Sequence, residues 1–113
     1  MVNYQPHLDT VFHALAHEAR REMLRRLAGH ELTVGELAAP LDMSLPAASR
    51  HIQVLEAAGL VQRTVQGRRH LCRLNAGPIA SAMDWMRFYE RFWTERLDAL
   101  ESQLADHPYL DQE

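Results

Sequence analysis

The sequence predicts a mainly helical α+β fold of four helices that include a helix-turn-helix, a two-stranded β-hairpin, and a long C-terminal helix. Three observations lead to this fold class. Apolar residues recur at helical intervals of three and four through residues 9–59, alternate with polar residues through 60–74, and return to the helical interval over 77–105. A chain of 113 residues is long enough for one small core. We therefore expect residues 1–113 to form a single domain.

Two helices are expected in the N-terminal part of the chain. Residues 1–8 show no helical periodicity and are expected to form an arm, after which Asp9 is a candidate N-cap for a short helix. The next helix, EARREMLRRLAG, gathers its apolar residues on one face and is stopped by Gly29. Its arginines are expected on a solvated face, paired with neighbouring glutamates; these residues are Arg20, Arg21, Arg25, Arg26, Glu18 and Glu22.

Residues 33–59 have the spacing of a helix-turn-helix. Thr33 and Glu36 form a capping box that opens a short helix, and Pro40 ends it. Only a tight connection remains before Ser44, where the second helix begins. In this arrangement the first helix crosses the backbone of DNA and the second helix lies in the major groove.

The stretch SLPAASRHIQVLEAAG, from residue 44 to 59, predicts this second helix. Ser44 is its N-cap and Gly59 its left-handed C′ residue. An apolar stripe should face the core; it consists of Leu45, Ala48, Ile52 and Leu55. The opposite face is small and polar, which allows close approach to base edges. We expect it to bind DNA through Ser44, Pro46, Ala47, Ser49, Arg50 and Gln53.

Residues 60–74 predict a β-hairpin in which Gly67 supplies the positive φ of the turn. A hairpin directly after a recognition helix is a wing, and its tip arginines, Arg68 and Arg69, are expected to hold phosphates or enter the minor groove. An ordinary charged hairpin is the alternative. Cys72 points to the core side of the second strand and is expected to be a small core residue.

The charge distribution supports a nucleic-acid partner despite a net charge of −3. Residues 50–73 contain five arginines against one acidic residue, Glu56, whereas the segments on both sides are acidic. A basic island in an acidic chain is expected of a protein that contacts phosphate through one surface.

The helix expected over 77–105 carries more apolar surface than a small domain can cover alone. A partner chain is the natural cover, because apolar residues recur along the helix at the intervals of a helix–helix seam. We expect a homodimer whose seam includes Trp93, Leu97, Leu100 and Leu104.

No apolar run in the sequence is long enough to cross a bilayer, and MVNYQPHLDT lacks the basic-then-apolar pattern of a signal peptide. The single cysteine, Cys72, excludes a disulfide within the chain. These features predict a cytoplasmic protein without a membrane partner. No nucleophile with a paired base, glycine-rich phosphate loop or acidic pair indicates an enzyme.

In these motifs the chain resembles the ArsR-type winged-helix transcriptional repressors, over nearly its whole length. ALAHEARREMLRRL resembles the family's second helix, ELTVGELAAPL its third, SLPAASRHIQVLEAAGLV its recognition helix and QGRRHLCRLN its wing. FWTERLDALESQL is similar to the tail of the metal-free SdpR-like branch. The resemblance implies the winged-helix fold and binding to double-stranded DNA.

The chain departs from the metal-sensing members of that family. Their paired cysteines in the third helix are replaced here by Thr33 and Gly35, and the Asp and His ligands of their last helix have no counterpart around Asp84. His7, His13 and His17 remain as a conceivable alternative site, but a helix break is expected at His17. We therefore expect no metal and no cofactor. Leu45 also departs from relatives that carry a base-reading Gln at this position.

The leading hypothesis is a dimeric, metal-independent repressor that occludes a promoter carrying an inverted repeat. One rival is a sensor of the same fold, which releases DNA when a metal or small molecule binds near the N-terminal histidines or when Cys72 is oxidised. A second rival is a protein interaction module that uses its long helix and has lost DNA binding.

Overall fold

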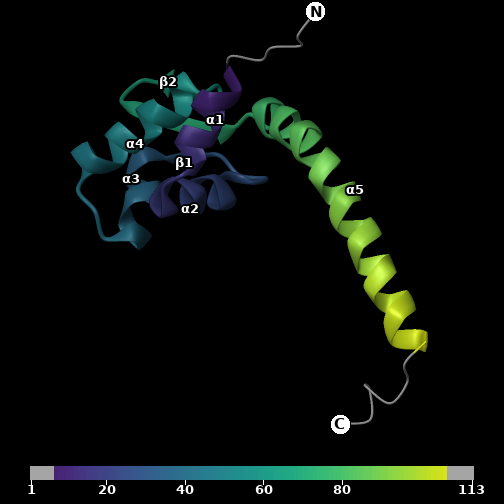
Figure 1. Cartoon of the computed structure of the whole chain (residues 1–113). Coiled ribbons are helices and arrows are strands. Elements are labelled where there is room, and N and C mark those ends of the chain that lie inside the picture. The colour runs from purple at the N-terminus through teal and green to yellow at the C-terminus, as the bar shows by residue number, and fades with distance from the viewer. Residues whose placement is uncertain (1–6, 107–113) are drawn as a thin grey trace, which may run out of the picture. The chain divides into compact units, whose positions relative to one another are not determined.

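The computed structural model of the protein describes residues 7–106 (Figure 1). Its elements in chain order are α1 (His7–Leu15), α2 (Glu18–Leu27), β1 (Leu32–Thr33), α3 (Val34–Ala38), the 3-10 turn η1 (Ala39–Leu41), α4 (Leu45–Ala57), β2 (Val61–Gln66), β3 (Arg69–Leu74) and α5 (Gly77–Asp106). The helix-turn-helix, the hairpin and the long last helix are all present, so the predicted winged-helix fold class is confirmed.

The chain divides into two compact units, Met1–Ala82 and Met83–Glu113, with the division inside α5. The first unit holds α1 to α4, the sheet and the first residues of α5. Its core draws on every one of α1 to α4 and on the hairpin. The largest fully buried side chains are Val11, Met23, Leu27, Leu37, Ile52, Leu55, Leu60 and Cys72.

Local hydrogen bonds fix both ends of α4 as the sequence predicts. The Ser44 hydroxyl accepts the Ala47 N–H at 3.2 Å, and Gly59 has a φ of +75° just beyond the helix. The side-chain amide of Asn75 donates to the Gly59 carbonyl at 2.9 Å, so a residue after the hairpin also holds this turn. These contacts set where the recognition helix starts and stops within the fold.

The sheet has three antiparallel strands in the order β1-β3-β2. The β2–β3 hairpin is the predicted wing, and Gly67 at its turn has a φ of +63°. The strand β1 was not predicted, since two residues are too few to show an alternating pattern. It pairs Leu32 with Cys72 and so ties the base of the wing to the start of α3.

The N-terminal boundary differs from the prediction. Helix α1 begins at His7, so Asp9 lies in its first turn instead of at the N-cap. An acidic side chain in that turn still interacts favourably with the helix dipole, which explains the sequence signal. Residues 1–6 of the predicted arm lie outside the described part of the chain.

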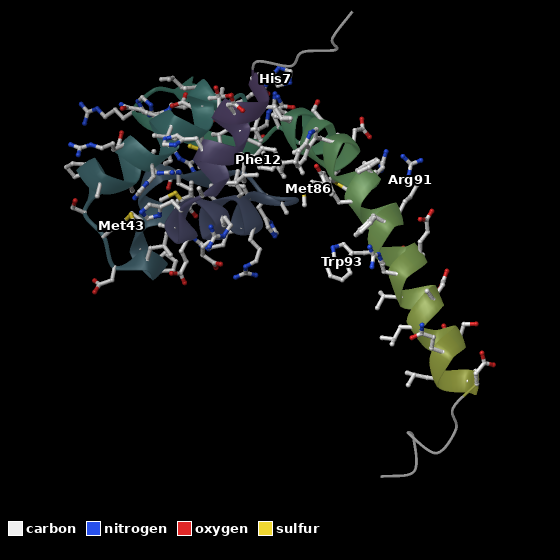
Figure 2. All side chains as sticks on the ribbon, viewed as in Figure 1. His7, Phe12, Met43, Met86, Arg91 and Trp93 are labelled. Atoms are coloured by element: carbon white, nitrogen blue, oxygen red, sulfur yellow. The ribbon has the colours of Figure 1, made fainter. Side chains whose placement is uncertain are left out.

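In the second unit, α5 continues to Asp106 with a large apolar side that the chain itself leaves exposed. Figure 2 shows Met86 and Trp93 on one side of this helix and Arg91 on the other. The helix nevertheless carries many charged residues. Among the described residues, no helix is long and apolar enough to span a membrane.

Candidate nucleic-acid interface

Helix α4 has one buried face and one face exposed to solvent. Ala48, Ile52 and Leu55 are fully buried and anchor the helix on the core. The predicted DNA-contacting residues lie on the other side: Ser44, Pro46, Arg50 and Gln53 are exposed, and Ala47 and Ser49 are half-buried. The open face therefore presents short side chains and one arginine to solvent.

The start of α4 and the wing border one surface hollow of about 570 Å³. This hollow brings together four of the predicted contact residues, namely Pro46, Ser49, Arg68 and Arg69. Ser44, Ala47, Arg50 and Gln53 do not line it. The remaining lining residues are Thr33, Val34, Gly35, Leu45, Arg63 and His70. Parts of the chain that are distant in sequence thus share one basic and partly apolar concavity.

Leu45 is not a core residue, contrary to the prediction from the apolar stripe of α4. It is 58% exposed and lines the hollow. The helical interval places it in line with Ala48 and Ile52, but it is the first residue of the helix and the core does not cover it. Periodicity therefore identified the direction of the side chain without showing where the core ends.

The arginines of the basic island fall into two groups. Arg63 donates to a Glu56 carboxylate oxygen at 2.7 Å, and Arg73 donates to the side-chain oxygen of Gln62 across the strands. None of the three ion pairs among the described residues includes Arg50, Arg68 or Arg69. These last three are exposed and keep their charge available for an external anion.

The Arg63–Glu56 pair positions the wing relative to the recognition helix. Glu56 lies near the C-terminal end of α4 and Arg63 lies on β2, so the bond joins the recognition helix to the wing. Arg63 also approaches His70 on β3, with 3.4 Å between Nη1 and Nδ1. The sequence placed Arg63 in the basic island but did not reveal this structural role.

A second set of polar contacts holds α4 against α1 and α2. Arg20 is 8% exposed and donates to two main-chain oxygens at the end of α1, those of His13 and Ala14. Its Nη1 lies 3.2 Å from Nδ1 of His51 on α4. The prediction that Arg20 lies on a solvated face is therefore wrong, because carbonyls that end α1 provide buried acceptors.

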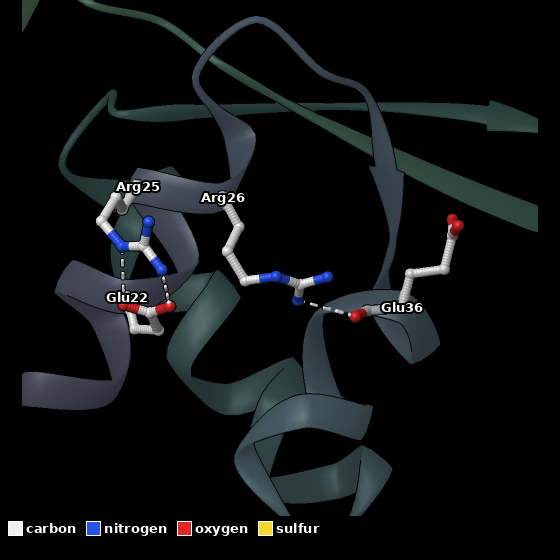
Figure 3. A network of polar contacts seen from close by, with 4 residues as sticks. All are labelled: Glu22, Arg25, Arg26 and Glu36. Atoms are coloured by element: carbon white, nitrogen blue, oxygen red, sulfur yellow. Dashed lines mark hydrogen bonds and ion pairs between the residues drawn. The ribbon is translucent and has the colours of Figure 1, made fainter.

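Other arginines of α2 behave more nearly as predicted. Arg25 and Glu22 form an exposed ion pair within the helix (Figure 3). Arg26 instead donates to the main-chain oxygen of Glu36 at 2.8 Å, which links α2 to α3. The side chain of Glu36 accepts the Thr33 N–H at 2.8 Å and completes the predicted capping box, which also lowers its pKa.

The candidate histidine site is divided between elements. His13 lies on α1, whereas His17 is the N-cap of α2 and its Nδ1 accepts the Ala19 N–H at 3.1 Å. That bond occupies one of the two ring nitrogens. Within residues 7–106, no group of three or more His, Cys, Asp or Glu is placed to hold a metal ion.

Cys72 is fully buried, as predicted for a core residue. Burial raises the pKa of its thiol above the ordinary value of 9.0, with the nearby Arg63 acting in the opposite direction. A thiol with a raised pKa has less of the reactive thiolate at neutral pH.

Comparisons with known proteins agree with this geometry. A family model described as a helix-turn-helix domain matches residues 15–64. The HTH-type transcriptional regulator Rv2034 of Mycobacterium tuberculosis is 39% identical over 98 residues, which cover 87% of this chain and 88% of that protein. The transcriptional repressor SdpR of Bacillus subtilis is 28% identical over 70% of this chain and 88% of its own.

Solved structures are similar over the same region. An ArsR family transcriptional regulator, RHA00566, has a TM-score of 0.75 and 36% identity, and the match covers 83% of this chain and 97% of that one. The homodimeric winged helix-turn-helix DNA-binding domain Mb0332 of Mycobacterium bovis has a TM-score of 0.59 and 26% identity, covering 88% and 95% of the two chains.

The fold and its exposed basic surface define a winged helix-turn-helix protein that binds DNA and regulates transcription. Rv2034 and RHA00566 each exceed 30% identity and match over most of their own length, and the second is an ArsR regulator. This chain belongs to the ArsR family of transcriptional regulators.

Proposed function

We propose that the protein is a homodimeric repressor that binds an inverted-repeat operator and needs no bound metal ion for binding. One observation carries this proposal: Pro46 and Ser49 at the start of α4 line one surface hollow together with Arg68 and Arg69 of the wing. The relative SdpR, a repressor, is consistent with this direction of regulation.

The two parts of this surface have different roles in the proposal. Ser44, Ser49, Arg50 and Gln53 face the major groove, where Arg and Gln side chains distinguish base pairs through their donor and acceptor patterns. Pro46 and Ala47 are small enough to let the helix approach the groove closely. Arg68 and Arg69 hold phosphates or enter the adjacent minor groove, which adds affinity that depends little on sequence.

The dimer in this proposal forms through the apolar side of α5. Trp93 is 63% exposed and Leu97 57% exposed in the single chain, and Leu100 follows on the same side of the helix. Leu104 continues that side. Such a row is larger than a monomer ordinarily leaves open to water. The homodimeric relative from Mycobacterium bovis supports the same state of assembly.

Independence from metal in this proposal follows from the side chains available. Thr33 and Gly35 offer no thiolate, and the ring nitrogen of His17 that caps α2 already accepts a hydrogen bond. The burial of Cys72 argues against oxidation as the trigger for DNA release. These points disfavour the metal-responsive and redox-responsive forms of the sensor alternative.

The proposal can be tested by selecting bound sequences from a random pool of double-stranded DNA, with and without added Zn²⁺. We expect one inverted repeat to be enriched under both conditions, with half-sites about one helical turn apart or a multiple of that distance. A reporter placed behind this site should be expressed less when the protein is present. Failure to bind any DNA at low salt would favour the interaction-module alternative, and enrichment in only one of the two metal conditions would favour the sensor.

A further inference from the structure

Among the described residues of the first unit, two large apolar side chains are exposed, whereas the others are buried or half-buried. They are Leu45, the first residue of α4, and Val65 on β2, which are 58% and 59% exposed. All other exposed large hydrophobic residues in the described chain belong to α5. Leu45 is the first residue of the recognition helix, and the core does not cover it.

The position of Leu45 is set by the elements around it. The Ser44 cap fixes where α4 starts, so Leu45 occupies its first helical position. A Cβ built on Gly35 would lie 4.0 Å from Cδ2 of Leu45, so the leucine lies against a position of α3 that carries no side chain. It then forms part of the hollow with Pro46 and Arg69 and is open to solvent.

The chemistry of this side chain restricts what it can recognise. Leucine has no donor or acceptor, so it cannot read the hydrogen-bonding pattern of a base edge. The C5-methyl group of thymine is the apolar feature that the major groove displays, and apolar side chains contact it. A cytosine or a purine edge in the same place would lose hydration of its polar atoms without gaining a partner.

We propose that Leu45 contacts the C5-methyl group of a thymine and thereby selects thymine at one position of each half-site. This inference rests on the proposed binding of DNA by α4 and adds a specificity-determining residue to that surface.

The test uses the enriched operator and replaces its thymines one at a time with deoxyuridine, in both half-sites together. Deoxyuridine keeps the base-pairing edge and removes only the methyl group. For the wild-type protein we expect one position at which this change weakens binding by about threefold to fivefold per half-site, as the transfer of one methyl group out of water implies. In the Leu45→Ala variant, the same change should have no effect.

Two further variants make the test specific. Val65→Ala removes an equally exposed apolar group from the wing and should keep the full response to deoxyuridine. Leu45→Gln should shift the preference at the same position from thymine to adenine, because glutamine pairs with the adenine edge. Circular dichroism should show that all three variants are folded.

The outcomes separate this inference from the proposed function. If the wild-type protein binds no DNA, the proposed function is wrong, and so is the inference that rests on it. If it binds the operator but no deoxyuridine substitution weakens it, or the weakening persists in Leu45→Ala, then only the role of Leu45 is wrong.

Discussion

Arg20 on α2 and His51 on the recognition helix lie side by side, with 3.2 Å between Nη1 of the arginine and Nδ1 of the histidine. An arginine can only donate, so this hydrogen bond requires an unprotonated Nδ1 on His51. The ring centroid of His17 lies 4.5 Å from that of His51. One polar contact between α4 and the N-terminal helices therefore requires a neutral His51.

This relationship predicts that acid weakens the fold through His51. Burial lowers the pKa of His51 below its ordinary value of 6.5, and the neighbouring His17, Arg20 and Arg50 lower it further. The unfolded chain thus binds a proton at a higher pH than the folded chain does. The stability that this group provides is complete above about pH 6.5 and is lost as the pH falls from there through the folded pKa. Chemical denaturation at a series of pH values measures it.

The variant His51→Gln isolates this effect from the other histidines. Glutamine offers an oxygen acceptor to Arg20 but does not titrate between pH 5 and 7. The free energy of unfolding of this variant should depend less steeply on pH than that of the wild-type protein. Equal slopes for the two proteins would mean that His51 does not contribute to the acid sensitivity.

The exposed arginines of the wing are expected to contribute to the salt dependence of DNA binding. Arg69→Ala should weaken binding to all DNA sequences similarly and flatten the plot of log affinity against log salt by about one unit for each phosphate that the variant no longer neutralises. Arg73→Ala is the matched control, because Arg73 is an exposed arginine of the same strand that is bound to Gln62. A fluorescence titration at several salt concentrations gives both slopes. An unchanged slope in Arg69→Ala would mean that the wing does not contact phosphate through this residue.

Arg50 predicts a different behaviour, because it lies on the exposed face of the helix proposed to enter the groove. Arg50→Ala should relax the preference at particular base pairs and cost on the order of 1 to 3 kcal/mol for each base that the arginine recognises. Repeating the selection from a random pool with this variant shows which positions lose their preference. A uniform loss at all sequences would instead assign Arg50 to a phosphate.

How well the sequence predicts a feature of this protein depends on how far apart in the chain the interacting residues lie. Helix ends are local, so the Ser44 cap and the Thr33–Glu36 capping box were found from neighbouring residues. Arg20 was misplaced because its acceptors belong to another helix, and no spacing within α2 reveals them. A two-residue strand such as β1 has no pattern of its own and exists through its partner β3.

The same reasoning applies to the candidate interface. The polar face of α4 follows from helical geometry and was predicted as a set. The exposure of Leu45 could not be predicted, since it depends on which element reaches the first turn of the helix. The structure was also needed to distinguish Arg63 from the exposed arginines, because its partner Glu56 lies on a different element, α4.

Cys72 predicts resistance to oxidation. Its side chain is fully buried and its raised thiol pKa leaves little thiolate. A disulfide reagent should modify the unfolded protein rapidly and the native protein far more slowly. DNA binding should be the same before and after mild peroxide treatment, both in the wild-type protein and in Cys72→Ala. Release of DNA by peroxide in the wild-type protein alone would instead make Cys72 a redox switch.

The last prediction concerns assembly through α5. Replacing two seam residues, in Leu97→Glu with Leu100→Glu, would bury unpaired carboxylates if the proposed dimer persisted, at a cost of several kcal/mol for each ion. The chain should therefore dissociate, and ultracentrifugation should report the mass of one chain, 13.0 kDa. Specific DNA binding should also fall sharply, because a single protomer loses the second half-site that the dimer holds at high effective concentration.

A matched variant, Ala99→Glu with Ser102→Glu, adds the same charge at exposed positions on the side of α5 away from the apolar row. This control should remain a dimer and bind the operator as the wild-type protein does, since its carboxylates stay in water. Its comparison with the seam variant separates loss of the interface from the effect of two extra negative charges. If the seam variant remains dimeric and binds normally, α5 is not the dimerisation element, and the two recognition helices must be paired through another surface.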